Sequence, residues 1–248
     1  MAERKTETRE ILDPNQAVAL FDVDQTLISG YTVFPFVDML VDQGVVDRSI
    51  SQALKEDRQS HKNETITYQE FADNVVTHYC QGLEGKSQQQ VEEVGRQFLA
   101  FIRPVMLCDF SPELVREMNK HARTIAISGS PVEVLRPLAD HLRITEVRGL
   151  EAEVSNGYYT GRVKTNMAVR EEKEKQIASL KASGFVTKTS FAFGDSDSDI
   201  PILEAVDNPF AVNPNQALRE IAEKRGWEIV NSENILSRVR ARLTNLQI

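Results

Sequence analysis

The chain has 248 residues and a formal net charge of −8 at pH 7, with 41% hydrophobic and 27% charged residues. This composition is typical of a globular protein with a sizeable core. The acidic balance argues against nucleic acid or an anionic membrane surface as the main partner. No apolar run is long enough to span a bilayer, and the two cysteines follow no metal-ligand spacing, so we expect a reduced, cytoplasmic location.

The first feature along the chain is a polar segment, residues 1–16, which is predicted to be a flexible tail. AVALFDVD (17–24) follows and is predicted to be a buried strand ending in two aspartates. Because alternate residues of a strand point to the same face, Asp22 and Asp24 crowd like charges into one place. This crowding is costly unless a cation or a shared proton relieves it.

Residues 31–109 contain several helical patterns and no convincing strand. The patterns are VFPFVDMLVDQG, DRSISQALKEDRQ, TYQEFADNVVTHYCQG and SQQQVEEVGRQFLAFI. They predict a helical insertion between the first strand and its next partner. Pro104 and the Ser111-Pro112 pair fit a boundary where the chain returns from this insertion.

Strands and helices alternate in the rest of the chain. EAEVSNGYYTGRVK (151–164) is predicted to be a hairpin, because Asn156-Gly157 between alternating runs is a strong turn signal. The alternation predicts an α/β fold with a doubly wound, mostly parallel sheet formed by residues 17–30 and 110–248. The further predicted strands are TIAIS (124–128), TSFAFGDSD (189–197), PFAVN (209–213) and WEIVN (227–231), and the helices are PELVREMNKHA, EEKEKQIASLKASG and NQALREIAEKRG.

Polar residues end three of the predicted strands, 17–24, 124–128 and 189–197, although these strands lie far apart in the sequence. In open α/β sheets the ligand binds beyond the carboxyl ends of the strands, so we expect these residues to converge. The carboxylates of Asp22, Asp195 and Asp199 suit a hard, oxygen-preferring cation, and magnesium is the usual choice beside phosphate. Ser128 with the backbone N–H of Gly129 is a candidate phosphate cradle.

The order of four motifs resembles the haloacid dehalogenase (HAD) superfamily, in its phosphoserine phosphatase-like branch. The motifs are DVDQT (22–26), the Ser128-Gly129 turn, a lysine in EEKEKQ and GDSDSD (194–199). The resemblance implies a Rossmann-like core with an inserted helical cap, residues 31–109, that closes over the site. It also implies a magnesium-dependent phosphomonoester hydrolase acting on a small phosphorylated metabolite.

The resemblance assigns roles to individual residues. Asp22 is expected to be the nucleophile that forms an aspartyl-phosphate, and Asp24 the acid and base that serves the leaving group and the water. Lys173 is the expected motif lysine, with Lys175 as an alternative and a merely solvated helix face as a third reading. The expected magnesium ligands are Asp22, Asp24 through its backbone carbonyl, Asp195 and Asp199, and the expected phosphate or substrate contacts are Thr26, Ser128, Gly129 and Tyr31.

Two positions depart from the phosphoserine phosphatase pattern. Those enzymes carry a glutamate where this chain has Tyr31, and it holds the substrate amino group. They also carry an asparagine where this chain has Ser198. Phosphoserine phosphatase proper and a catalytically silent phosphate-binding module are the alternatives to a phosphatase of another small metabolite. The four histidines, His61 among them, show no ligand spacing and are expected to be ordinary polar residues.

Overall fold

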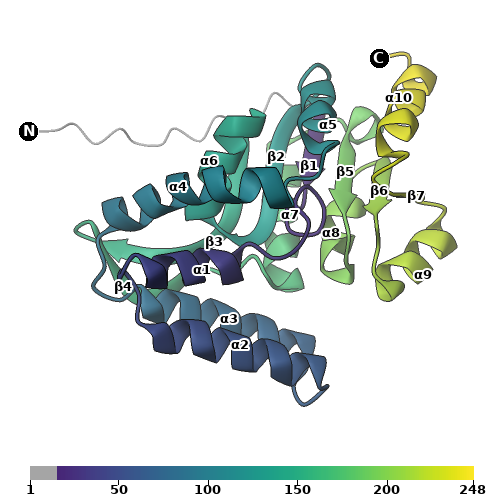
Figure 1. Cartoon of the computed structure of the whole chain (residues 1–248). Coiled ribbons are helices and arrows are strands. Elements are labelled where there is room, and N and C mark those ends of the chain that lie inside the picture. Colours follow the sequence, from purple (N-terminus) through teal and green to yellow (C-terminus); the bar gives the residue numbers. More distant parts are fainter. Residues whose placement is uncertain (1–15) are drawn as a thin grey trace, which may run out of the picture.

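A central sheet organises the described part of the chain, residues 16–248 of a computed structural model (Figure 1). Its strand order is β4-β3-β2-β1-β5-β6-β7, and every neighbouring pair is parallel except β3 and β4. The predicted α/β class with a mostly parallel sheet is therefore confirmed. The strands are β1 (Val18–Phe21), β2 (Arg123–Pro131), β3 (Glu146–Ser155), β4 (Tyr158–Thr165), β5 (Phe191–Gly194), β6 (Asn208–Val212) and β7 (Glu228–Val230).

Strand β1 is buried on both faces, as its uninterrupted apolar sequence requires. Ala19 and Phe21 belong to one hydrophobic cluster, whereas Val18 and Leu20 belong to a second. Since alternate side chains of a strand point to opposite faces, the sheet carries a core on each face, as a doubly wound fold does. The central place of β1 sets Asp22, the next residue, in the middle of the carboxyl edge of the sheet.

The predicted hairpin is present, and its first strand is longer than expected. Asn156 and Gly157 have φ of 52° and 82°, the left-handed values that a tight two-residue turn needs. Strand β3 begins at Glu146 because its first half pairs in parallel with β2, while its second half pairs with β4. Sequence alternation predicted only the second half, and the first half, EVRGL (146–150), was not predicted to be a strand.

Four helices occupy the predicted insertion, and α2 and α3 lie side by side at one end of the molecule (Figure 1). A capping box between Thr67 and Glu70 starts α3. Their buried side chains, such as Phe36 and Tyr79, join the same hydrophobic cluster as Phe21 of the sheet. The boundaries of a separate cap at residues 31–109 therefore stay a prediction. The helices are α1 (Val33–Asp42), α2 (Arg48–Lys62), α3 (Tyr68–Gly82) and α4 (Gln88–Met106).

The loop between α3 and α4 is bonded to the hairpin. The Gly85 N–H donates to the Tyr159 carbonyl at 2.9 Å, and the Tyr159 N–H donates to the Lys86 carbonyl at 3.0 Å. These bonds cover the edge of β4 and tie the helical segment to the sheet. The predicted tail, residues 1–16, lies outside the described residues except for Gln16.

Three of the remaining helices, α6, α8 and α10, were not predicted, and α8 has only four residues. Helix α6 contains Pro137, which normally ends a helix, whereas α10 carries buried Ile235, Val239 and Leu243 at helical spacing, a signal that was readable. Within residues 16–248, no helix combines the length and the apolar character needed to cross a membrane. The remaining helices are α5 (Ser111–Met118), α6 (Val132–Leu142), α7 (Arg170–Ser183), α8 (Ile200–Leu203), α9 (Gln216–Arg225) and α10 (Ile235–Leu246).

Candidate active site

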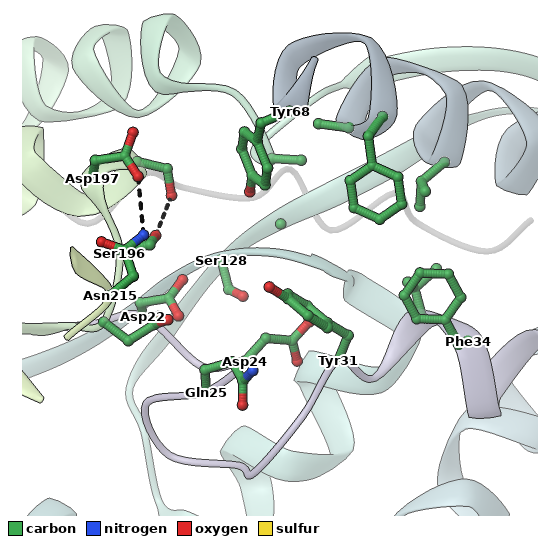
Figure 2. A pocket seen from close by; sticks show the side chains of 18 of the residues that line it. Asp22, Asp24, Gln25, Tyr31, Phe34, Tyr68, Ser128, Ser196, Asp197 and Asn215 are labelled. Atoms are coloured by element: carbon green, nitrogen blue, oxygen red, sulfur yellow. Dashed lines mark hydrogen bonds between the residues drawn. The ribbon is translucent and has the colours of Figure 1, made fainter. Parts of the chain in front are cut away.

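The ends of three strands meet at one cavity of about 870 Å³ (Figure 2). Asp22 follows β1, Ser128 lies in β2, and Asp195 follows β5, and all three line this cavity. The structure therefore brings together the residues expected to converge at the carboxyl edge of the sheet.

Three carboxylates form an acidic cluster at the cavity, two of which line it while Asp199 is buried behind them. Asp22, Asp195 and Asp199 each offer an oxygen within 4.8 Å of the others. Burial and then the charge of Asp199 raise the pKa of Asp22 well above its usual value, and the same two causes raise the pKa of Asp195 to about 8. The cluster thus holds more negative charge than its surroundings compensate. Such a set of oxygen donors fits a hard divalent cation such as magnesium.

Lys173 of α7 is the cation inside this cluster. Its side chain is 2% exposed, and its Nζ lies 3.2 Å from Asp22 Oδ1 and 2.5 Å from Asp199 Oδ1. Burial alone would lower the pKa of Lys173, but the charges of Asp199 and Asp22 raise it above the usual value, so the lysine stays charged. Lys175, the alternative, is 73% exposed and pairs with Glu172 at 3.1 Å on the surface.

Asp199 is fully buried and orders the loop that carries Asp195. Its Oδ2 accepts hydrogen bonds from the backbone N–H groups of Asp195 and Ser196, both at 3.0 Å. Gly194 makes room for this carboxylate, because a Cβ at position 194 would lie 2.5 Å from the Asp199 Cβ. The glycine before the first aspartate of the GDSDSD motif is therefore a steric requirement.

Gly194→Ala is expected to lower kcat/KM by about 100-fold, because the added methyl displaces Asp199 and, through it, Lys173 and Asp195. The measurement is steady-state kinetics together with the unfolding temperature. Gly82→Ala in α3 is the control, since its Cβ would meet only the side chains of Ile50 and Val46, at 3.0 to 3.2 Å. Unchanged kinetics in Gly194→Ala would show that the position of Asp199 is unimportant.

Asp24 is held by residues at the start of α1. Its Oδ1 accepts a hydrogen bond from the Thr32 N–H at 3.2 Å, and the Thr32 hydroxyl donates to Ser130 Oγ at 2.9 Å. Burial raises the pKa of Asp24 to about 6, so this carboxyl can both carry and release a proton near neutral pH. Thr32 was not among the expected site residues, and no motif marks it.

Three of the four residues expected to contact phosphate or substrate line the cavity, and the fourth, Thr26, does not. Ser128, Gly129 and Tyr31 line the cavity, and Tyr31 is 40% exposed. A Cβ at Gly129 would lie 2.9 Å from the Ala168 Cα, so this position also requires glycine. Thr26, in contrast, is buried, and its hydroxyl donates to Asp195 Oδ1 at 3.4 Å. In this structure Thr26 supports a carboxylate of the acidic cluster.

One wall of the cavity was not predicted from the sequence. Arg58, His61 and Lys62 of α2 and Tyr68 of α3 line it. The spacing of 58, 61 and 62 places these three side chains on one helix face, which was a readable signal. On the opposite side Asn215, the N-cap of α9, donates its backbone N–H to the Asp195 carbonyl at 2.8 Å.

Comparison with known proteins identifies the family. The haloacid dehalogenase-like hydrolase family matches residues 19–204. A histidinol-phosphatase of Neisseria meningitidis is 27% identical over 86% of this chain and 98% of its own length. Phosphoserine phosphatase SerB1 of Mycobacterium tuberculosis is 27% identical over 86% of this chain and 70% of its own length.

Solved structures share the fold at lower identity. A Bordetella pertussis protein of unknown function superimposes with a TM-score of 0.71 at 23% identity, covering 88% of this chain and 99% of its own. A phospho-aspartyl intermediate analogue of phosphoserine phosphatase gives 0.63 at 16% identity, covering 92% and 98%. The chain belongs to the haloacid dehalogenase-like hydrolase family, and the predicted resemblance is confirmed. It is an enzyme of the phosphatase type within that family.

Proposed function

We propose that this enzyme is a magnesium-dependent phosphomonoester hydrolase that acts on a small phosphorylated metabolite through an aspartyl-phosphate. The observation that carries the proposal is the placement of Asp22, whose Oδ1 lies 3.2 Å from Lys173 Nζ inside the cavity. Lys173 lowers the pKa of Asp22 against the effects of burial and Asp199, and bound magnesium would lower it further, so that the ionised carboxylate can act as the nucleophile.

In the proposed first step, Asp22 attacks phosphorus and the bond from phosphorus to the ester oxygen breaks. Asp24 gives its proton to the leaving alkoxide, which then departs as the alcohol. In the second step Asp24 takes a proton from water, and the water oxygen attacks phosphorus and releases Asp22. The pKa of about 6 at Asp24 supports this double role.

The residues that would hold magnesium are Asp22, Asp24 through its backbone carbonyl, Asp195 and Asp199. When bound, the ion supplies positive charge that lets a phosphate dianion enter a site of like charge. Ser128 and Gly129 are proposed to hold the phosphate oxygens, and Thr26 to orient Asp195. Lys173 offsets part of the negative charge of Asp22 and Asp199 and is proposed to attract the phosphate.

Removal of the metal tests this proposal. Hydrolysis of p-nitrophenyl phosphate is expected to stop in EDTA and to return when excess magnesium is added, because the three carboxylates otherwise repel the phosphate. The control is the same EDTA and magnesium mixture prepared before the protein is added. Turnover that survives exhaustive chelation would contradict the metal proposal. Binding of inorganic phosphate without any turnover would support the alternative of a silent phosphate-binding module.

Phosphoserine phosphatase proper is the second candidate, since a relative and structural neighbours carry that name. Tyr31 argues against it, because a phenol offers no negative charge to an ammonium group. Phosphoserine is therefore expected to be a poor substrate. Tyr31→Glu is expected to raise kcat/KM for phosphoserine severalfold relative to a phosphomonoester whose alcohol part carries no charge. Tyr31→Gln is the control for shape without charge. A wild-type preference for phosphoserine over every other ester would refute this reading.

We further propose that residues 31–109 act as the cap and determine specificity. The residues at the strand ends would contact the phosphate and the metal, which all candidate substrates share. The part of the substrate that differs must then be recognised by the wall formed by α1, α2 and α3.

A further inference from the structure

Aromatic rings contributed by Tyr31 and by α1, α2 and α3 form a continuous wall along one side of the cavity. Phe34 and Phe71 stack with their centroids 6.3 Å apart, and His61 stacks on Phe71 at 5.0 Å. Tyr31 and Phe34 pack edge to face, and so do Tyr68 and His61, whose ring centroids are 5.9 Å apart. Figure 2 shows Tyr31 and Tyr68 pointing into the cavity. A wall of this kind favours a flat, largely apolar group, because rings stack on rings at low entropic cost.

Apart from Lys173, which lies within the acidic cluster, the charged groups that line the cavity are divided between its two sides. All four carboxylates that line it, on Asp22, Asp24, Asp195 and Asp197, follow β1 or β5. Of the described residues, those that α1, α2 and α3 contribute to the lining include two cations, Arg58 and Lys62, and no carboxylate.

Arg58 and Lys62 are available to a ligand. The Arg58 guanidinium lies over the Phe34 ring, with its Cζ 5.1 Å from the centroid. Within residues 16–248, neither side chain has a carboxylate within the 4.0 Å that defines an ion pair, unlike Lys55 on the same helix, whose Nζ pairs with Asp38 at 3.0 Å. A buried nitrogen, His61 Nδ1, also lacks a hydrogen-bond partner among the described residues.

We propose that the substrate is a phosphomonoester whose alcohol carries a flat, aromatic group with an anionic substituent at the end remote from the phosphate. This inference rests on the proposed function and names its substrate class. The rings would hold the flat group, and Arg58 and Lys62 would pair with the anion. The volume of about 870 Å³ lies in the range of roughly 300–1,000 Å³ that encloses drug-sized ligands.

An ammonium group is the competing occupant, because aromatic rings also attract cations. Arg58 already covers one face of Phe34, and Lys62 adds a like charge beside it. Charge repulsion therefore disfavours a cationic substituent at this end of the cavity.

A series of benzyl phosphates tests the proposal, because their leaving alcohols are closely matched. We expect kcat/KM for 4-carboxybenzyl phosphate to exceed that for 4-(aminomethyl)benzyl phosphate by about tenfold or more. The carboxylate would pair with Arg58 and Lys62, whereas the ammonium group would be repelled by them. Benzyl phosphate should also exceed cyclohexylmethyl phosphate, which has similar size but is not flat. A 4-phosphonobenzyl ester distinguishes a preference for a phosphate-like anion from one for a carboxylate.

The double variant Arg58→Gln, Lys62→Gln should reduce the ratio between the carboxy and aminomethyl esters to about unity. Lys55→Gln is the matched control, since it removes one charge from the same helix but outside this cavity, and it should leave the ratio unchanged. A ratio near unity or inverted in the wild type, or a ratio unaffected by the double variant, would overturn the proposal.

Binding of the corresponding benzylphosphonates, which cannot be hydrolysed, separates this inference from the proposed function. Calorimetry in magnesium should give tighter binding of the 4-carboxy compound, again dependent on Arg58 and Lys62. Selective binding without turnover of any ester would refute the phosphatase proposal alone. Turnover of all the esters without selectivity would refute the substrate class alone.

Discussion

Asp22→Asn is expected to lower kcat for p-nitrophenyl phosphate by roughly 10⁴-fold or more, because an amide of the same shape cannot attack phosphorus. The proposed reaction then has no first step, so neither the alcohol nor phosphate should be released. The measurement is steady-state turnover at saturating magnesium, together with the unfolding temperature to show that the variant folds.

The matched control for Asp22→Asn is Asp197→Asn. Asp197 lines the same cavity, and its Oδ1 accepts a hydrogen bond from the Asn215 side chain at 3.1 Å, but no catalytic role is proposed for it. A much smaller loss is expected there. Comparable losses in the two variants would mean that the charge of the cavity, and not a nucleophile at Asp22, accounts for activity.

Asp24→Asn is expected to have the second largest effect, and its size should depend on the leaving group. With an alkyl phosphate, kcat should fall by roughly 10³-fold, because the alkoxide leaves unprotonated. With p-nitrophenyl phosphate the leaving group needs little help, so the first step should persist and appear as a burst of p-nitrophenol. Rapid-quench kinetics measures this burst. Equal loss of the first step for both esters would contradict the assigned role of Asp24.

The pH dependence follows from the same residue. Burial raises the pKa of Asp24 from 3.8 to about 6, so the protonated form that the first step needs persists up to that pH and is lost above it. For an alkyl phosphate, kcat/KM should therefore fall as the pH rises through about 6, and this limb should flatten for p-nitrophenyl phosphate. A limb of the same steepness for both esters would assign the titration to another group.

The sequence best predicted the site residues that directly follow or end the parallel strands. Asp22, Ser128 and Asp195 could be expected to meet, because polar residues at the ends of parallel strands share one edge of a sheet. The lysine was harder to choose, since EEKEK is charged on all sides of α7, and only Ile177 and Leu180, four and seven residues after Lys173, mark the face that turns inward. The packing of α7 on that face leaves Lys173 buried and Lys175 exposed.

Thr26 was expected to contact phosphate from its place in the DVDQT motif, but its hydroxyl donates to Asp195. It lies in a tight turn in which the Val23 carbonyl accepts from the N–H groups of Thr26, Leu27 and Ile28. In this turn the Thr26 hydroxyl points toward Asp195. No pattern in the sequence indicates the turn or the orientation of the Thr26 side chain.

The ring wall of the cavity depends on tertiary packing. The face of α2 that carries Arg58, His61 and Lys62 is polar, so periodicity alone predicts a solvated surface. That face borders the cavity only because α2 and α3 pack against each other and the loop after α3 is bonded to the hairpin. Helical spacing could group these residues, but it could not place them beside Asp22.

Trapping of the proposed intermediate tests the central claim most directly. The protein would be mixed with p-nitrophenyl phosphate and magnesium, quenched in acid within one turnover, and the acyl phosphate located by borohydride reduction and peptide mass spectrometry. We expect the modification at Asp22, with a higher yield in Asp24→Asn, whose second step is slowed, and none in Asp22→Asn. Rapid turnover with no covalent phosphate, or with the phosphate on another residue, would contradict the aspartyl-phosphate mechanism proposed here.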